Sequence, residues 1–334
     1  MSSPGAHSCI PEHRTALVMH EACGRHDTGW AHPEHQGRLP AILNAIYLQT
    51  PALLDLVLQV EADPVIEADI LRAHSPAHLE RLHKAAQMAH ETERIVGLDS
   101  ETLVSPASWD AALAAAGCVL TAARLVLEGA VPTAFALSRP PGHHATEDTA
   151  MGFCLLNNVA ITARWLRTVG VNRILIVDWD VHHGNGTQDI FYADPAVYYL
   201  SLHQYPHYPG SGHPDERGAG AALNTIRNVQ VMAGTNGPEY RQLFDTALTD
   251  TLSEFSPEFV LVSAGFDCLR ADPLGGLALE PADLHNLTRG LLERVGVSTS
   301  RVVHALEGGY HPERLGRGVV AVLRALAGLP ERDA

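Results

Sequence analysis

Short apolar runs alternate with longer amphipathic stretches along most of the chain. Three runs are almost continuously apolar: ILIV (174–177), FVLV (259–262) and VVHAL (302–306). Runs of this length are typical of strands buried on both faces of a parallel sheet. The pattern predicts strands at Thr15–Met19, Thr133–Leu137, Arg173–Val177, Val197–Leu202, Val229–Met232, Phe259–Ser263 and Val302–Leu306.

Helical patterns fill the intervals, and several carry signals for their ends. Ser75 before Pro76 is a helix cap with proline at the first position, and Gly129 and Gly170 are stop signals. Helices are predicted at Pro76–His90, Ser108–Glu128, Asn157–Val169, Pro238–Phe255, Pro281–Val295 and Pro312–Leu326. The alternation predicts an open α/β sheet covered by helices on both faces. We expect one domain at 15–327, with a loose leader at 1–14 and a loose tail at 328–334.

Composition fits a soluble globular protein with a large core. Of the 334 residues 46% are hydrophobic and 18% are charged, and the formal net charge is −15. That acidity argues against general nucleic-acid binding, which needs a basic surface. The five scattered cysteines contain no CxxC pair, which disfavours a disulfide framework or a thiolate metal site. No apolar run approaches the ~20 residues that span a membrane, and no signal-peptide core is present, so a cytoplasmic protein is expected.

Polar motifs follow five of the predicted strands. In open α/β sheets, ligands bind beyond the carboxyl ends of the strands. The motifs are RPPGHHA (139–145), DWDVHHGNG (178–186), SLHQYPHYPG (201–210), SAGFD (263–267) and EGGY (307–310).

Two of these motifs offer ligands for a metal ion. Asp180 and His182 leave the end of one strand two residues apart, so both side chains can turn toward one point. Asp267, at the end of another strand, is the natural third ligand, and a catalytic zinc takes three protein ligands and keeps one position open. The alternative is a surface loop with a capping aspartate and incidental histidines.

Two further motifs offer proton-transfer groups and a hydrogen-bond donor. His143 and His144 suit acid–base chemistry near neutral pH. Two glycines before Tyr310 allow a tight turn that brings its phenol over the site, where it can donate to an oxyanion. A chance histidine pair and an ordinary core tyrosine are the alternatives. Together with the metal ligands, these groups form the set that metal-assisted amide hydrolysis needs.

The motifs together resemble the histone deacetylase family. The matching strings are RPPGHHA, MGFCLLNNVA, ILIVDWDVHHGNGTQDIF, SLHQY, LVSAGFD, DPLGG and LEGGY, with HPEHQGRL (32–39) similar to an early family element. WDVHHGNGTQ resembles the class II branch and its bacterial amidohydrolase relatives. The resemblance runs from about Thr15 to about Leu326. It implies the arginase/deacetylase-like α/β fold, an eight-stranded, mostly parallel sheet flanked by helices.

The resemblance also implies roles for the motif residues. Asp180, His182 and Asp267 become zinc ligands. His144 becomes the general base and then the acid, while His143 assists electrostatically and Tyr310 donates to the oxyanion.

Two neighbours of the histidines follow from the same resemblance. Asp178 would orient His143. Asn185 stands where the class I branch has an aspartate, which should leave His144 less basic.

The resemblance places further residues around the substrate. Phe153 and Tyr208 match the aromatic walls of an acyl-lysine tunnel, with Tyr208 standing where phenylalanine is usual. Gly152 matches a glycine whose carbonyl accepts the substrate N–H. Arg38 matches an arginine that lines a cavity beneath the site. Ordinary core packing is the alternative for the two aromatic residues.

Potassium sites are a further implication. Family members hold potassium beside the zinc loop. Matching positions here are the Asp178 and Ser201 side chains, the carbonyls of Asp180, His182 and Leu202, and, at a second site, carbonyls near Phe191 and Val197.

The sequence therefore predicts a zinc-dependent hydrolase that removes acetyl or another short acyl group from lysine in a peptide or protein. An acetylpolyamine amidohydrolase would use the same catalytic set. Leu274 bears on this choice, because the polyamine-selective branch places a glutamate there. An arginase-type ureohydrolase would need two manganese ions and more aspartates. A non-catalytic acyl-lysine binding module is the remaining alternative, and the presence of Tyr310 argues against it. Neither a nucleic acid nor a membrane is expected as a partner.

Overall fold

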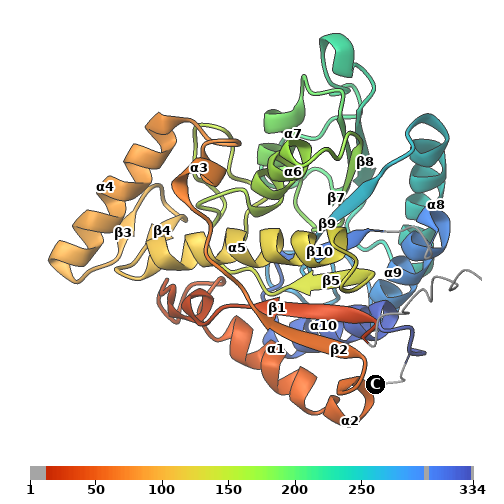
Figure 1. The fold of residues 1–334 in the computed structure, drawn as a ribbon, viewed down its shortest axis with the longest axis horizontal. Helices are drawn as coiled ribbons and strands as arrows, with labels where there is room; N and C mark the ends of the chain where they lie inside the picture. The colour runs from red at the N-terminus through yellow and green to blue at the C-terminus, as the bar shows by residue number, and fades with distance from the viewer. Residues whose placement is uncertain (1–12, 297–300, 332–334) are drawn as a thin grey trace, which may run out of the picture.

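The computed structural model describes residues 13–296 and 301–331, which form an eight-stranded sheet flanked by helices (Figure 1). The strand order is β2-β1-β5-β10-β9-β6-β7-β8, and every pairing in this sheet is parallel. The strands are β1 (Thr15–Met19), β2 (Val57–Glu61), β5 (Thr133–Ala136), β6 (Ile174–Asp178), β7 (Val197–Gln204), β8 (Ile226–Val231), β9 (Phe259–Ala264) and β10 (Val302–Leu306). A separate antiparallel pair joins β3 (Val96–Gly97) and β4 (Leu103–Val104). The predicted fold class is confirmed.

Parallel pairing brings the carboxyl ends of the central strands to one edge. Asp178, the last residue of β6, lies opposite Ser263 of β9 and Ser201 of β7. On the other side of β9, Leu306 of β10 lies opposite Ala264. The loops that follow these strands therefore start level with one another and can build one site.

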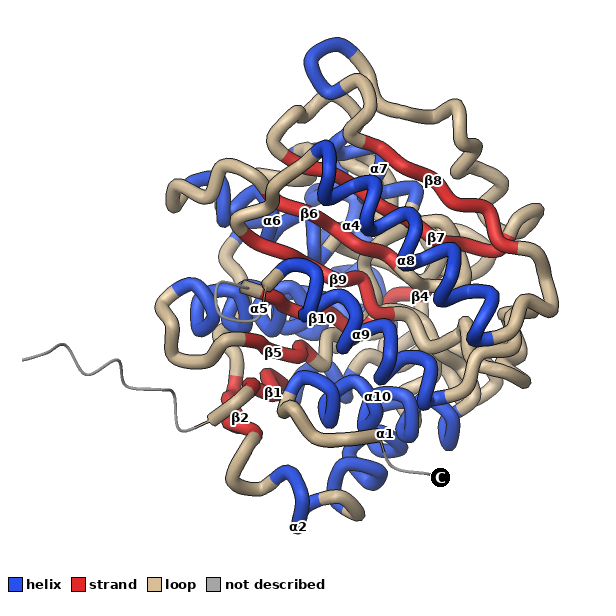
Figure 2. Tube along the Cα trace, turned by 90° about the vertical axis from the view of Figure 1, so that its right-hand side faces the viewer, coloured by secondary structure: helices blue, strands red, loops and turns tan. Residues whose placement is uncertain are grey.

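Helices cover both faces of the sheet. On one face, α5 (Ser108–Leu127) packs on β1, β5 and β10, and α6 (Asn158–Thr168) packs beside it. On the other face, α1 (Arg38–Tyr47) packs on α10 (Pro312–Leu326), α10 on α9 (Pro281–Val295), and α9 on α8 (Gly237–Glu254). Figure 2 shows α8, α9 and α10 in front of the strands and α5 behind them. The shorter or peripheral helices are α2 (Thr50–Leu53), α3 (Glu67–Ile70), α4 (Pro76–Thr92), α7 (Asn185–Phe191), η1 (Glu21–Arg25) and η2 (Gly220–Ala222).

Helix ends follow the local chemistry of the sequence. Ser75 accepts a hydrogen bond from the His78 N–H at the start of α4, with Pro76 in the first position. At the start of α8, Asn236 and Glu239 form a capping box. Helices α9 and α10 have the predicted bounds, and the other predicted helices differ by one or two residues at their ends.

The sequence missed β2 of the main sheet and both strands of the separate pair, β3 and β4. The β2 residues VLQVE alternate between buried or half-buried and more exposed positions, and Glu61 is exposed, because β2 is an edge strand that pairs only with β1. The short helices α1 and α7 were also not predicted. Residues 1–12 of the expected leader and 332–334 of the expected tail lie outside the described residues. In the described part of the tail, the carbonyls of Leu329 and Pro330 accept hydrogen bonds from His285 and Arg324.

Helix α5 and the cysteines belong to the core. Within the described residues, α5 alone has the length and apolar composition of a membrane-crossing helix, and 72% of that segment is buried inside the fold. It is therefore positioned as a central core helix. The four described cysteines, Cys23, Cys118, Cys154 and Cys268, are buried and unpaired, while Cys9 lies outside the described residues.

Five buried histidines should make the fold sensitive to acid. Burial lowers the pKa of His26 and His203 to about 4 and that of His74, His183 and His304 to about 3, from an ordinary value of 6.5. Each is neutral when folded but takes up a proton on unfolding below pH 6.5, so stability falls as the pH falls. Between pH 6.5 and 5 each should lower the free energy of unfolding by roughly 1.5 kcal/mol. Urea unfolding across this range measures the loss.

His304 offers the single-residue test of this prediction. Neither of its ring nitrogens has a hydrogen-bond partner in the described part of the chain, and its ring lies 6.3 Å from that of Phe135. His304→Phe should remove about one of the five increments and leave stability at pH 7.5 equal or higher, since a buried polar group without a partner is lost. An unchanged dependence of stability on pH would contradict the assignment.

Candidate metal and catalytic site

Three predicted ligands meet at the carboxyl edge of the sheet. The ligand atoms of Asp180, His182 and Asp267 all lie within 4.8 Å of one another, and the three side chains are buried. His182 Nδ1 is 3.0 Å from Asp180 Oδ1 and 3.2 Å from Asp267 Oδ2. Asp180 and His182 follow β6, and Asp267 follows β9, the neighbouring strand. The loops thus bring together residues that are 87 positions apart in the sequence.

The electrostatics of this cluster fit a divalent cation. Burial and the charge of Asp180 raise the pKa of Asp267 to about 7. Although burial opposes it, the two carboxylates raise the pKa of His182 to about 10. One ring N–H cannot satisfy both carboxylates, and Asp267 Oδ2 accepts no hydrogen bond in the described residues. Two carboxylates and one imidazole are the donor set of a catalytic zinc site. A bound cation would relieve the repulsion between the carboxylates of Asp180 and Asp267.

Glycines let the backbone approach the cluster. A Cβ at Gly308 would lie 2.1 Å from Asp267 Oδ2, and its N–H donates to Asp180 Oδ2 at 2.9 Å. Gly265 is equally confined, because its Cβ would lie 2.2 Å from Asp180 Oδ2. Any side chain at these positions would displace a ligand carboxylate.

His143 is held by a buried carboxylate. Its Nδ1 is 3.0 Å from Asp178 Oδ2, and the Tyr199 hydroxyl donates to the same oxygen at 2.9 Å. Burial alone would lower the pKa of His143, but Asp178 and Asp180 raise it to about 10. The two carboxylates therefore favour the protonated form of His143. Asp178, which the sequence predicts to orient His143, is within hydrogen-bonding distance of it, and Tyr199 is an additional contact to Asp178.

His144 has the opposite character. Its Nδ1 is 2.8 Å from Asn185 Oδ1, an acceptor that selects the tautomer with hydrogen on Nδ1 and leaves Nε2 as the basic nitrogen. Burial and the charges on His143 and His182 lower the pKa of His144 well below its ordinary value. The two adjacent histidines thus differ in charge. His144 is suited to accept a proton, and His143 is suited to stabilise negative charge.

Glu307 ties the histidine loop to β10. Its Oε2 accepts the N–H groups of Gly142 and His143 at 2.7 and 3.2 Å, and its Oε1 accepts from Ser263 Oγ at 3.1 Å. No role was predicted for Glu307, because the backbone groups that it binds lie about 165 residues away in the sequence. No local pattern signals such a contact.

Tyr310 closes the site from the end of β10. Its ring makes an edge contact with that of Phe153, with centroids 5.7 Å apart, and the Arg38 guanidinium lies 5.1 Å from its centroid. Arg38 is fully buried and donates to the carbonyls of Gly309 and Glu307 and to Glu34 Oε1. Arg38 therefore supports the turn that carries Tyr310.

A pocket of about 170 Å³ opens over these groups. It is lined by Glu101, His144, Gly152, Phe153, His182, His207, Tyr208, Leu274 and Tyr310. All four predicted substrate residues are therefore at its wall. Gly152 has a φ of +55°, and a Cβ there would lie 2.4 Å from His144 Cδ2. Tyr208 is 36% exposed and makes an edge contact with His144, with centroids 5.1 Å apart.

Two pocket residues were not predicted. His207 stacks on His182, with ring centroids 4.9 Å apart, and its Nε2 is 2.8 Å from the Leu274 carbonyl oxygen. Glu101 comes from the loop between β3 and β4. The Glu101 carbonyl contacts the His32 ring, and the hydroxyl of Thr102 in the same loop accepts the Phe153 N–H. His207 stands in a motif that the sequence singled out, whereas Glu101 has no signal because its hairpin belongs to no strand of the main sheet.

The residues of the first expected potassium site lie at this edge, whereas Val197 of the second lies at the opposite edge of the sheet, where it pairs with Ile174. Asp178 and Ser201 are register partners on β6 and β7, and Leu202 follows on β7. Phe191 ends α7, and Val197 begins β7. All of these residues are buried.

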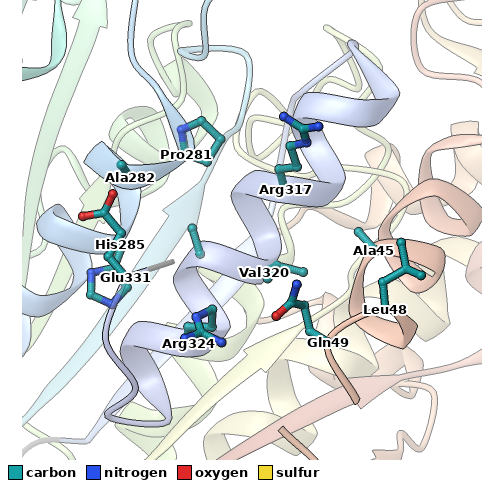
Figure 3. A pocket seen from close by; sticks show the side chains of 11 residues that line it. Ala45, Leu48, Gln49, Pro281, Ala282, His285, Arg317, Val320, Arg324 and Glu331 are labelled. Carbon is teal, nitrogen blue, oxygen red and sulfur yellow. The ribbon is translucent and has the colours of Figure 1, made fainter. Parts of the chain in front are cut away.

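A larger groove of about 460 Å³ shares no lining residue with the catalytic pocket. Figure 3 shows its side chains, which come mainly from α1, α9 and α10 and include Ala45, His285, Arg317 and Arg324. In the part of the chain that the structure describes, the one group of side chains that could hold a metal does not line it. The chemistry is therefore placed in the smaller pocket.

Comparisons with known proteins agree with this geometry. The histone deacetylase domain matches residues 32–326. An uncharacterized protein of Synechocystis sp. is 41% identical over 93% of this chain and 99% of its own length. Human histone deacetylase 9 is 37% identical over 97% of this chain, which spans 34% of that protein. A probable deacetylase of Archaeoglobus fulgidus is 34% identical over 94% of this chain and 86% of its own length.

A solved structure shares the fold. The crystal structure of the HDA15 HD domain superposes with a TM-score of 0.88 at 34% identity, covering 95% of this chain and 89% of that one. The chain belongs to the histone deacetylase family. Membership supports deacetylase or amidohydrolase activity, and with it an acylated substrate.

Proposed function

We propose that this protein is a zinc-dependent deacylase that removes acetyl or another short acyl group from the lysine side chain of a peptide or protein. The observation that carries the proposal is the convergence of Asp180, His182 and Asp267 at the base of a pocket that also holds His144 and Tyr310. A zinc ion held by the three ligands would polarise the acyl carbonyl and lower the pKa of a bound water.

The protein's own residues supply the proton transfers. His144 is neutral, with Nε2 as its basic nitrogen, so it takes a proton from the attacking water. His143 stays protonated beside Asp178 and stabilises the negative charge that develops nearby. The Tyr310 hydroxyl donates to the oxyanion. His144 then returns its proton to the leaving amine, and a carboxylate and a free amine result.

The pocket walls support an extended acyl-lysine side chain. Phe153 and Tyr208 line the pocket as aromatic walls for a methylene chain, and the Gly152 carbonyl would accept the amide N–H of the substrate. The small volume of about 170 Å³ favours acetyl and other short acyl groups. We also propose potassium at the Asp178 and Ser201 side chains, with the carbonyls described above.

The rival activities receive less support. The described residues contain one group of metal-ligating side chains, whereas a ureohydrolase needs ligands for two ions. A binding module without activity would not need His143, His144 and Tyr310 around the same pocket. An acetylpolyamine amidohydrolase remains the alternative that shares the whole set. Glu101 gives the pocket one carboxylate, so some attraction for cationic substrates is expected in either case.

A substrate panel tests the proposal. The zinc-loaded protein is assayed for released amine with acetyl-, propionyl- and butyryl-lysine peptides, acetylspermidine and acetylputrescine. We expect the highest kcat/KM for a short-chain acyl-lysine peptide. A preference for acetylspermidine would replace the lysine assignment with the polyamine alternative, and no hydrolysis of any amide would reject deacylase activity.

Leu274 should set the balance between the two substrate classes. It lines the pocket and is partly exposed, so a carboxylate there would meet the distal ammonium of a polyamine. Two charges ~4 Å apart attract by about 4 kcal/mol at an effective dielectric of ~20. Leu274→Glu should therefore shift the preference, measured as kcat/KM for acetylspermidine divided by kcat/KM for an acetyl-lysine peptide, toward acetylspermidine by at least about tenfold. A tenfold shift requires only ~1.4 kcal/mol of this attraction.

Leu274→Gln is the matched control for this change, because it has the same length without the charge. An equal shift in both variants would assign the effect to shape rather than charge. No shift in either would make Leu274 a packing residue of the rim.

A further inference from the structure

One buried carboxylate holds two loops of the site at once. Asp272 lies between β9 and α9, two residues before Leu274 of the pocket rim, and is 7% exposed. Its Oδ2 accepts the backbone N–H groups of Tyr310 at 2.7 Å and His311 at 3.2 Å, and its Oδ1 accepts the Leu274 N–H at 2.9 Å. Hydrogen bonds from N–H groups to a carboxylate are stronger than those between neutral groups.

The turn before Tyr310 needs such an anchor. Tyr310 follows two glycines, and Gly309 has a φ of +120°, a conformation open to glycine but unusual for other residues. A glycine pair at the end of a strand leaves the next residue free to take several directions. Arg38 fixes the carbonyls of Glu307 and Gly309, but it makes no contact with the Tyr310 N–H. Asp272 supplies the missing restraint at the residue that carries the phenol.

The same carboxylate reaches the substrate rim. The Leu274 N–H is fixed by Asp272, and the Leu274 carbonyl is fixed by His207, which stacks on the metal-ligand candidate His182. The rim that meets the substrate and the turn that carries the oxyanion donor are therefore connected through Asp272.

We propose that Asp272 is a positioning residue that aims the Tyr310 hydroxyl at the reacting carbonyl by holding the Tyr310 N–H. This inference rests on the proposed function. Asp272 does not itself contact the substrate carbonyl. Its effect on turnover is exerted through Tyr310, so it disappears when the Tyr310 hydroxyl is absent.

A double-mutant cycle tests this dependence. The kinetics of the unmodified protein, Asp272→Asn, Tyr310→Phe and the double variant are compared on the best substrate of the panel. Asparagine keeps the size but offers one acceptor oxygen for three N–H groups. We expect Asp272→Asn to lower kcat about 10- to 100-fold with KM within about twofold and zinc content unchanged. In the Tyr310→Phe background the same change should lower kcat by less than about twofold.

Asp283→Asn is the matched control. Asp283 also accepts a backbone N–H, that of Glu280 at the start of α9, but its partner carries no catalytic group. This variant should leave kcat unchanged. Equal losses from Asp272→Asn in both tyrosine backgrounds, or full activity of Asp272→Asn, would overturn the proposal. An unmodified protein that hydrolyses nothing rejects the proposed function itself, which is a different result.

Hydrogen exchange gives a readout that does not depend on activity. The amides of Tyr310 and His311 should exchange slowly in the unmodified protein and at least about tenfold faster in Asp272→Asn. If asparagine prevents folding, Asp272→Glu keeps the charge but moves the acceptor by one methylene, and it should show the same faster exchange and lower kcat. Unchanged exchange in a folded variant would show that Asp272 does not hold this turn.

Discussion

Replacing Asp267 with asparagine is expected to remove zinc from the protein and to stop hydrolysis without unfolding it. The change removes one of the two carboxylates that converge with His182, and two protein ligands do not make a catalytic zinc site. Asparagine keeps the side-chain size, and its oxygen can still accept the Val181 N–H that Asp267 Oδ1 accepts at 2.9 Å. The fold around the site should therefore persist.

The effect of zinc on thermal stability tests the same site independently of activity. A ligand present at ~1,000 times its Kd stabilises the folded state by about 4.1 kcal/mol. Zinc should raise the melting temperature of the unmodified protein but not of Asp267→Asn. Without metal the variant should be at least as stable as the unmodified protein, because the repulsion that raises the pKa of Asp267 is gone.

Asp189→Asn serves as the control, because Asp189 is an exposed carboxylate on α7 outside the ligand cluster. It should keep zinc at about one ion per chain, full activity and the rise in melting temperature. Metal analysis that finds Asp267→Asn fully loaded and active would exclude Asp267 as a ligand.

The sequence predicted the sheet where burial dominates the residue pattern. Strands β6, β9 and β10 are buried along their whole length, so their apolar runs are nearly continuous. The edge strand β2 is only partly covered, and five residues of mixed polarity do not stand out from a loop. At β8, another edge strand, the pattern indicated only the last part of Ile226–Val231.

The site was predictable as far as its residues share a motif or a strand end. Asp180, His182 and Asp267 follow adjacent strands, so parallel topology alone brings them together. Glu307 and Asp272 act through hydrogen bonds to backbone groups of distant loops. Any residue can supply a backbone N–H, so these partners leave no mark in the sequence.

Removing only the Tyr310 hydroxyl should lower kcat by about 10² to 10³, or roughly 3–4 kcal/mol of transition-state stabilisation. Tyr310→Phe keeps the ring that contacts Phe153 and Arg38, so the pocket wall should stay in place. The ground-state carbonyl gains little from the donor, because the charge on its oxygen develops only as water attacks. KM should therefore change by less than about threefold, and zinc content should not change.

Tyr198→Phe separates the catalytic donor from the general loss of a buried hydroxyl. The Tyr198 hydroxyl accepts from Arg227 Nε at 3.1 Å and lies 3.4 Å from Glu254 Oε2, on the part of β7 away from the site. This control should lose stability on the order of 1 kcal/mol with kcat unchanged. If Tyr310→Phe retains full kcat while Tyr198→Phe behaves as expected, the bound metal and His143 stabilise the oxyanion without the phenol. In that case Asp272 could not affect kcat through the Tyr310 hydroxyl, because the hydroxyl itself would contribute nothing to kcat. A single measurement of Tyr310→Phe therefore bears on both residues.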